Sequence, residues 1–402
     1  DDETYNGRNF QARPVKEILF SNIVSFQPIP GDFNDSYLEG ISYYLPLMNT
    51  EDPLWRVIVF ESPQKQFVTF YCDHALFDGT AGTQFHRDLI SELAKELEHD
   101  YVLELLFLYP DDCYLLPKSM NGALEYTVDI FERPLWLKIY IFLKNSVFGL
   151  LYSKLLMFLG KTSIMSFAPL FKYKPVKNNK GYKYKIINFN NVQMAQLRKV
   201  CANEGVSITS YIGTVGIYSL QRTVFAKIPD MAKASSLLKI SVNGRRFYPN
   251  EILKLKYGVC VATFFEPLNY IEDIYDVARL TNTKTKQNIL TKSLFWTHGD
   301  SLKRNNFWNF YGNLIGNYHR DTLYTSNLGI INIKEKSWEG VDIWFSQSNG
   351  LMSHFVFSVA STPKGGMNIC LGYLPEYEQL KNDNDSIMNE FTNHFKKTSL
   401  GK

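Results

Sequence analysis

The feature that most constrains this chain is an abrupt change of pattern around a histidine. Residues 66–74, QFVTFYCDH, are rich in β-branched and aromatic residues and predict a strand. After Gly79 the apolar residues recur every four positions, with charged residues between them, at Phe85, Leu89, Leu93 and Leu97. This spacing predicts an amphipathic helix over 81–98. His74 therefore stands at the end of a strand, and a tight segment through Asp78 leads from it into the helix.

This arrangement suits acid–base chemistry better than the residue spacing alone would suggest. A histidine followed four residues later by an aspartate occurs often by chance, so the argument depends on the strand–HxxxDG–helix context. Rigid strand ends hold reactive side chains in place, and a neutral imidazole accepts protons near pH 7. Asp78 would clamp the loop by pairing with an arginine and would not contact the substrate. Gly79 leaves space and permits a positive φ.

Both halves of the chain mix strands and helices, which predicts an α/β fold. Residues 54–61 and 66–74 predict a hairpin, as do residues 354–373 around a Lys-Gly-Gly turn. In the second half, residues 236–247 predict a strand ending in two arginines, and residues 257–267 predict another. The apolar stripe Met194, Leu197, Val200 and Cys201 marks a helix, and a second helix follows Gly205.

Composition excludes several classes of protein. A length of 402 residues favours two domains, and a net charge of only +3 shows no nucleic-acid footprint. Five widely spaced cysteines without a CxxC pair predict neither a disulfide framework nor a zinc site. The histidines show no metal-ligand spacing, and the chain has no phosphate-cradling glycine loop and no Gly-x-Ser-x-Gly motif. Cys72 shares a strand face with His74, so a thiol nucleophile remains an alternative.

Two neighbouring segments are unusual. Residues 134–171 are strongly apolar, but Lys144 and Lys154 bracket only nine uncharged residues, whereas a membrane-spanning helix needs about 20 apolar residues. This segment either packs on the protein or lies in a membrane interface. Residues 172–185 contain six lysines and no acid, which indicates an exposed linker.

The predicted division of the chain is therefore an N-terminal subdomain at 1–171, a linker at 172–188, and a C-terminal subdomain at 189–402. Because the chain opens on DDETYNGRNF without Met, a trimmed start is expected.

Several segments carry a family resemblance. HALFDGTAG followed by a helix resembles the HxxxDG motif of coenzyme A-dependent acyltransferases, a superfamily that includes chloramphenicol acetyltransferase and peptide-synthetase condensation domains. Three further stretches resemble the fungal alcohol acetyltransferase family most: PLWRVIVF at 53–60, SVNGRRFYPN at 241–250 before YGVCVA at 257–262, and TSNLG at 325–329. That family begins with a helix and a strand before the first stretch, and residues 1–50 lack this pattern.

The resemblance implies two chloramphenicol acetyltransferase-like subdomains, each a mixed sheet with covering helices, and an active-site tunnel between them. His74 would be the general base. Asp78 would be structural, paired with Arg245 or Arg246, of which family position favours Arg245, because neighbouring residues on a strand point to opposite faces.

The resemblance also implies that Gly79 is structural, and it places Ser326 and Asn327 near the substrate channel. These two residues would bond the oxyanion or the thioester arm, with a loop-capping role as the alternative.

The implied reaction is transfer of an acyl group, expected to be acetyl from acetyl-CoA, to an alcohol or amine in a ternary complex without a metal. Two alternatives remain open: N-acetylation of a long-chain, sphingoid-like amino lipid at a membrane surface, and a non-catalytic member that binds a lipid or acyl carrier. A monomer with a small-molecule or lipid acceptor and no nucleic-acid partner is expected. The expected location is the cytoplasm, with peripheral contact to endoplasmic reticulum or lipid droplets left open.

Overall fold

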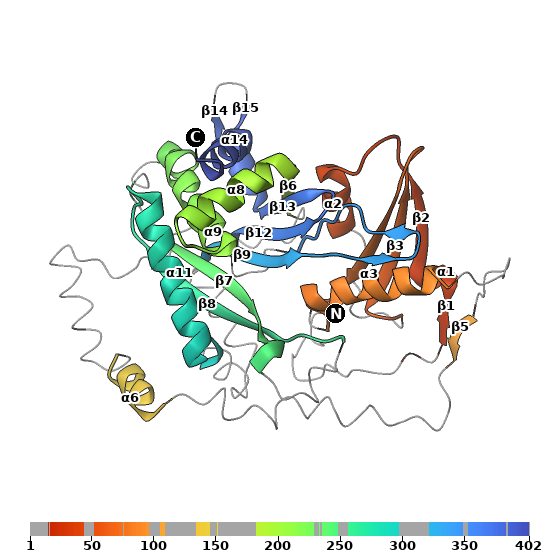
Figure 1. Cartoon of the computed structure of the whole chain (residues 1–402), viewed down its shortest axis with the longest axis horizontal. Coiled ribbons are helices and arrows are strands. Elements are labelled where there is room, and N and C mark those ends of the chain that lie inside the picture. The colour runs from red at the N-terminus through yellow and green to blue at the C-terminus, as the bar shows by residue number, and fades with distance from the viewer. Residues whose placement is uncertain are drawn as a thin grey trace, which may run out of the picture. The chain divides into compact units, whose positions relative to one another are not determined.

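In a computed structural model of the chain, the described residues fall into two compact units (Figure 1). The first unit comprises 1–126, 245–260 and 332–340, and the second comprises 127–244, 261–331 and 341–402. The first unit is therefore assembled from three separate stretches of sequence. The structure describes residues 15, 17–43, 52–74, 76–95, 105–108, 134–144, 151, 182–228, 233, 235–247, 256–296, 321–348, 353–382 and 385–401.

The first unit contains a three-stranded sheet in the order β2-β3-β4, formed by Val24–Pro28, Trp55–Glu61 and Gln66–Cys72. The predicted hairpin is confirmed, because β3 and β4 pair antiparallel around the Ser62–Lys65 turn. Strand β2 runs parallel to β3. Short elements complete the described part of this unit: β1 (Glu17–Leu19) with β5 (Leu105–Leu108), α1 (Phe20–Ile23), α2 (Asp35–Tyr43), and β10 (Lys334–Glu335) with β11 (Trp338–Glu339).

Helix α3 follows the hairpin and spans Gly79–Leu93. It confirms the predicted amphipathic helix but ends earlier than expected, and Leu97 lies outside the described residues. Its Phe85 ring stacks on Phe70 of β4 with centroids 4.2 Å apart, which packs the helix against the sheet. Before residue 50, where the sequence showed no such pattern, the structure has a strand and a helix, β2 and α2.

The second unit is built on a six-stranded mixed sheet in the order β6-β13-β12-β9-β7-β8. Strand β9 runs parallel to both neighbours, and the other pairs are antiparallel, including the predicted hairpin of β12 and β13. These strands are Lys183–Phe189, Gly366–Tyr373, Ser353–Thr362, Asp321–Ile330, Ser236–Asn243 and Val261–Leu268. Residues 183–188 of the predicted linker therefore belong to strand β6, and residues 172–181 lie outside the described residues.

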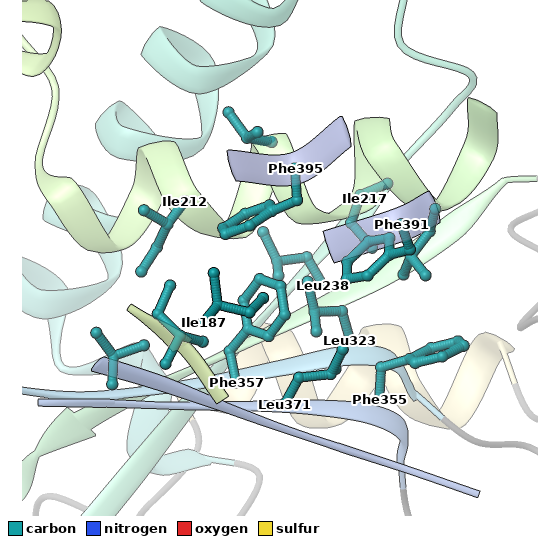
Figure 2. Close-up of a cluster of buried hydrophobic side chains, with 14 of the residues drawn as sticks. Ile187, Ile212, Ile217, Leu238, Leu323, Phe355, Phe357, Leu371, Phe391 and Phe395 are labelled. Carbon is teal, nitrogen blue, oxygen red and sulfur yellow. The ribbon is translucent and has the colours of Figure 1, made fainter. Parts of the chain in front are cut away.

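Four helices accompany this sheet: α8 (Asn191–Asn203), α9 (Ile208–Arg222), α11 (Ile274–Thr291) and α14 (Ile387–Ser399). The hydrophobic core lies between the helices and one face of the sheet. Figure 2 shows Ile212 and Ile217 of α9 and Phe391 and Phe395 of α14 above the sheet residue Phe357. Burial of these apolar side chains supplies the main stabilisation of the unit.

Helix α9 approaches the sheet closely because it carries glycines on the facing side. A Cβ added at Gly216 would lie 2.6 Å from Leu323 Cδ2 and 2.8 Å from Phe357 Cε2. A Cβ at Gly213 would lie 3.1 Å from Leu238 Cδ2. Glycine at these two positions is thus a packing requirement, despite its low helix propensity.

The remaining elements are short. Helix α6 spans Leu135–Lys144 in the second unit, and β14 (Lys381–Asn382) pairs with β15 (Asp385–Ser386). Single 3₁₀ turns lie at Phe225–Lys227, Gly244–Phe247, Ser293–Phe295 and Pro375–Gln379. Across the described ranges, no helix is long and apolar enough to cross a membrane.

Candidate active site

His74 occupies a turn directly after β4, and its side chain is exposed. The backbone N–H of Asp73 donates to the carbonyl of Leu54 at 2.9 Å, which ties the strand end to the start of β3. The carbonyl of Asp73 accepts from the N–H groups of Leu76 at 3.1 Å and Phe77 at 3.2 Å. The turn that carries His74 is therefore fixed by backbone hydrogen bonds on both sides of the histidine.

Asp78 anchors the other end of this turn. Its Oδ1 caps α3 by accepting from the N–H of Ala81 at 2.9 Å. Its Oδ2 accepts from Nη1 of Arg245 at 2.6 Å and from the N–H of Cys260 at 2.9 Å. Both side chains of the Asp78–Arg245 ion pair are buried. Both carboxylate oxygens of Asp78 are thus hydrogen-bonded, Oδ1 to the start of α3 and Oδ2 to Arg245 and the loop before β8.

The carbonyl of Gly258 ties the same three segments together. It accepts from Nη2 of Arg245 at 3.0 Å and from the backbone N–H of Asp78 at 3.2 Å. Gly258 has a φ of 117°, a backbone conformation that residues other than glycine rarely adopt. The backbone can therefore turn its carbonyl toward Arg245 and Asp78 because this residue is glycine.

Two expectations about this region are wrong. Strand β7 ends at Asn243, and Gly244–Phe247 form a 3₁₀ turn, so Arg245 and Arg246 are not neighbours on a strand. Arg246 is exposed, whereas Arg245 is buried. Strand β8 begins only at Val261, because residues 257–260 form the loop that bonds Asp78 and Arg245.

Gly79 does not adopt the positive φ that the sequence analysis considered for it. It is the first residue of α3 and is not among the glycines with positive φ. The positive φ in this part of the chain occurs at Gly258 instead. Sequence reasoning missed Gly258, although an isolated glycine in a strand-like run such as YGVCVA signals close backbone approach.

A second contact links α3 to the same loop. The Asp88 carboxylate accepts from Tyr257 Oη at 2.8 Å, Lys256 Nζ at 3.1 Å and Gln84 Nε2 at 2.8 Å. Burial is the largest single effect and raises the pKa of Asp88, but the three hydrogen bonds and the charge of Lys256 together outweigh it, and the pKa lies below its ordinary value. Burial and the bond to Asp88 raise the pKa of Tyr257 to about 12.

Cys72 is a poor nucleophile in this setting. Burial, with the charges of Asp73 and Asp78, raises the pKa of its thiol to about 12, so the thiolate is scarce near pH 7. Burial also lowers the pKa of His86 on α3 to about 4, which keeps that imidazole neutral. Among the described residues around this turn and α3, His74 is the exposed histidine.

Ser326 and Asn327 lie in the second unit, within strand β9 and not in a loop. Asn327 Nδ2 donates to Thr209 Oγ1 at 3.0 Å, and its Oδ1 accepts from the N–H of Gly329 at 2.8 Å. Ser326 alternates with the buried Thr325, so its half-buried side chain lies on the sheet face away from the helical core. The structure therefore brings Asp78, Gly79 and Arg245 together in one unit and places Ser326 and Asn327 in the other.

Within the described ranges, no group of three or more His, Cys, Asp or Glu side chains could hold a metal ion. The four described cysteines, Cys72, Cys201, Cys260 and Cys370, form no disulfide bond with one another.

The comparisons with known proteins give the decisive observation. A family model described as alcohol acetyltransferase matches residues 1–398. The chain belongs to the alcohol acetyltransferase family. The predicted family is thus confirmed, and membership makes the protein an acyltransferase with an acyl-coenzyme A cosubstrate and a small-molecule acceptor. A search of curated proteins finds no match.

Solved structures agree on the fold. The epimerization domain of tyrocidine synthetase B matches with a TM-score of 0.56 at 13% identity, over 94% of this chain and 81% of that one. The first condensation domain of the CDA synthetase matches with a TM-score of 0.55 at 13% identity, over 94% and 75%.

The trichothecene 15-O-acetyltransferase TRI3 from Fusarium sporotrichioides matches with a TM-score of 0.51 at 13% identity, over 92% of this chain and 76% of that one. At such low identity these likenesses show the fold alone, and they confirm the predicted two-part α/β class.

Proposed function

We propose that this alcohol acetyltransferase family member transfers an acetyl group from acetyl-CoA to an alcohol or amine, with His74 as the general base. The observation that carries the proposal is the turn around His74. Backbone bonds of Asp73 fix one end and the buried Asp78–Arg245 ion pair fixes the other, while the imidazole itself stays exposed. A rigid turn that presents an exposed imidazole suits proton abstraction.

In the proposed reaction His74 takes the proton from the acceptor hydroxyl or amine. The acceptor oxygen or nitrogen attacks the thioester carbonyl and forms a new bond to the acetyl carbon. The tetrahedral oxyanion then collapses, the carbon–sulfur bond breaks, and the departing thiolate of CoA takes the proton from His74. Ser326 and Asn327 are proposed to lie along the substrate channel, where Ser326 would donate a hydrogen bond to the oxyanion.

Asn327 fits a positioning role better than direct contact, because its amide is already bonded to Thr209 and to Gly329. These bonds hold the segment around Ser326 in register on β9. The high pKa of Cys72 supports direct transfer in a ternary complex over an acyl-cysteine intermediate.

The test is a thiol-release assay with purified protein, acetyl-CoA and a panel of alcohols and amines. The panel includes short-chain alcohols and a long-chain amino lipid, so that both acceptor classes are compared. Acceptor-dependent thiol release with intersecting initial-velocity lines is expected for direct transfer. Parallel lines would indicate a covalent intermediate, and an absence of release with every acceptor would favour the non-catalytic alternative.

A further inference from the structure

The large sheet of the second unit has two chemically different faces. Leu238 of β7, Leu323 of β9 and Phe357 of β12 belong to the apolar core between the sheet and the helices (Figure 2). Because side chains alternate along a strand, the residues that alternate with these core residues lie on the other face. On that face, four neighbouring strands each carry a hydroxyl residue in the same row: Ser358, Ser326, Ser241 and Thr263.

The hydroxyl residues of this row lie side by side across the strands. Ser326 pairs with Ser358, and Ser241 pairs with Thr263. The paired stretch of the parallel strands β7 and β9 ends one residue before Ser241 and Ser326, so these two are neighbours as well. Ser358 and Thr263 are buried, whereas Ser241 and Ser326 are half-buried. The two central hydroxyls are therefore the ones that a ligand can reach.

Tyr324 orients the hydroxyl of Ser241. It lies on β9, on the same face and two residues before Ser326, and its Oη is hydrogen-bonded to Ser241 Oγ. A phenol is a stronger acid than an aliphatic alcohol, so we infer that the tyrosine donates and the serine accepts. The hydrogen of Ser241 can then be donated to a ligand, and the bond that Ser241 accepts strengthens this donation.

The tyrosine ring is itself held by a charged neighbour. Lys239 of β7 pairs with Tyr324 in register, and its Nζ lies 4.7 Å from the centroid of the tyrosine ring, in a cation–π contact. The side chain of Lys239 is only 15% exposed, and Nζ lies 3.5 Å from Asp321 Oδ2. The Ser241 hydroxyl is thus oriented by partners that are themselves held, as a preorganised donor requires.

The spacing of Ser241 and Ser326 fits one bound oxygen. Neighbouring strands lie about 4.8 Å apart, and two hydroxyls that each approach one oxygen to about 2.8 Å can be at most about 5.6 Å from each other. An oxygen above the midline between β7 and β9 can therefore accept from both serines. Two convergent donors of this kind stabilise a carbonyl oxygen that gains negative charge.

We propose that Ser241 is a second donor, beside Ser326, to the thioester carbonyl oxygen of the acyl donor. This inference rests on the proposed acetyl transfer, in which the thioester is the carbonyl that gains charge. When the acceptor attacks the carbonyl carbon, the π electron pair of the C=O bond moves to this oxygen, and it returns when the carbon–sulfur bond breaks. Both hydrogen bonds strengthen while the oxygen carries the charge. Tyr324 is a positioning residue, because it acts on this oxygen only through Ser241.

The experiment measures kcat and KM of the full chain by thiol release, with acetyl-CoA and the best acceptor of the panel. Ser241→Ala should lower kcat about 10²-fold and leave the KM for acetyl-CoA nearly unchanged, because the lost bond forms in the transition state. Ser241→Thr keeps a hydroxyl and should recover most of the rate. The matched control is Thr263→Val, which removes the buried neighbouring hydroxyl on β8 and should leave kcat close to that of the wild type. Circular dichroism and thermal melting check that each variant is folded.

Tyr324→Phe tests the positioning role separately, because it keeps the ring beside Lys239 and removes only the hydroxyl. This variant should lower kcat roughly two- to tenfold, the worth of one ordinary hydrogen bond. The double variant Ser241→Ala with Tyr324→Phe should be no slower than Ser241→Ala alone, because the tyrosine acts through the serine. Losses that multiply in the double variant would contradict this positioning role.

Three results would overturn the proposal while leaving the proposed reaction intact. The first is a Ser241→Ala variant with the kcat of the wild type, and the second is an equal loss of kcat in Thr263→Val. The third is a defect confined to KM, together with weaker binding of CoA itself in calorimetry, which would assign Ser241 to the amide groups of CoA because CoA has no thioester carbonyl. A wild type without acceptor-dependent thiol release would overturn the proposed reaction and this inference with it.

Discussion

At the residue scale, Asp78 and Arg245 form an ion pair at 2.6 Å across 167 positions of sequence. The arginine also holds the carbonyl of Gly258, so one guanidinium joins the start of α3 to the loop before β8. A buried pair of this kind adds little net stability over an apolar pair, but removal of one partner leaves the other charge buried and unpaired. The pair is therefore better understood as fixing where the turn around His74 lies.

Substitution of the two adjacent arginines, one at a time, should show whether the ion pair with Asp78 anchors the loop. Arg245→Gln should lower the free energy of unfolding by about 3–5 kcal/mol, because Asp78 then keeps a buried charge without its cation. Arg246→Gln should change the free energy of unfolding by less than about 0.5 kcal/mol, because Arg246 is exposed. Urea unfolding of both variants measures the difference, and equal costs would show that the ion pair does not anchor the loop.

Substitution by alanine should lower the stability at Gly258 and raise it at Gly82. Gly258→Ala forces a φ of 117° on a residue with a Cβ and should cost about 1–3 kcal/mol of stability. Gly82→Ala, in the interior of α3 with no heavy atom within 4 Å of the added Cβ, should gain about 0.5–1 kcal/mol. Thermal or denaturant unfolding measures both, and a neutral Gly258→Ala would contradict the described loop conformation.

At the scale of elements, the strands and helices with a regular spacing of apolar residues were predicted correctly from the sequence. The β3–β4 and β12–β13 hairpins and the helices α3, α8 and α9 appear where the apolar spacing indicated them. The boundaries that failed, at residues 244–247 and 257–260, are the places where contacts with Asp78 override strand propensity.

The early elements were missed for a local reason. Helix α1 has four residues, and α2 has nine residues with Gly40 inside, so neither shows enough periodicity to be recognised. His74 and the choice of Arg245 came from a motif and a family resemblance. Gly258 and Asp88 were not predicted, because their structural roles depend on contacts between segments more than 160 residues apart.

The contact between α3 and the loop at 256–260 should depend on pH. Because the pKa of Asp88 is depressed in the folded state, its contribution is present above the pKa of the unfolded chain and is lost as the pH falls through the folded value. Asp88→Asn should therefore cost about 0.5–1 kcal/mol at pH 7, and this difference should shrink below about pH 4. Denaturant unfolding of both proteins across this range is the measurement, and a difference that stays constant in acid would exclude the carboxylate as the source.

At the scale of the whole molecule, the first unit takes two segments from the second half of the sequence. Local sequence could not predict this, because residues 245–260 look like the end of one strand and the start of another. The contribution of these residues to the site is nevertheless large, since Arg245, Gly258 and Cys260 supply the partners of Asp78.

A fragment test follows from this assembly. Residues 1–171 expressed alone should lack a cooperative unfolding transition or melt well below the full chain, because Asp78 would have neither Arg245 nor the N–H of Cys260 as a partner. Circular dichroism during heating compares the fragment with residues 1–402. A fragment that melts cooperatively at the temperature of the full chain would show that the first 171 residues form a domain by themselves.

The central claim is that His74 is the base of an acyl transfer. The most direct measurement is kcat for His74→Ala with acetyl-CoA and the best acceptor of the panel, together with the melting temperature. A loss of about 10²–10⁴-fold in kcat is predicted, with an unchanged melting temperature, because a general base contributes roughly that factor and an exposed side chain adds little stability. Partial recovery with added imidazole would support the assignment, and a variant that turns over near the wild-type rate would contradict it.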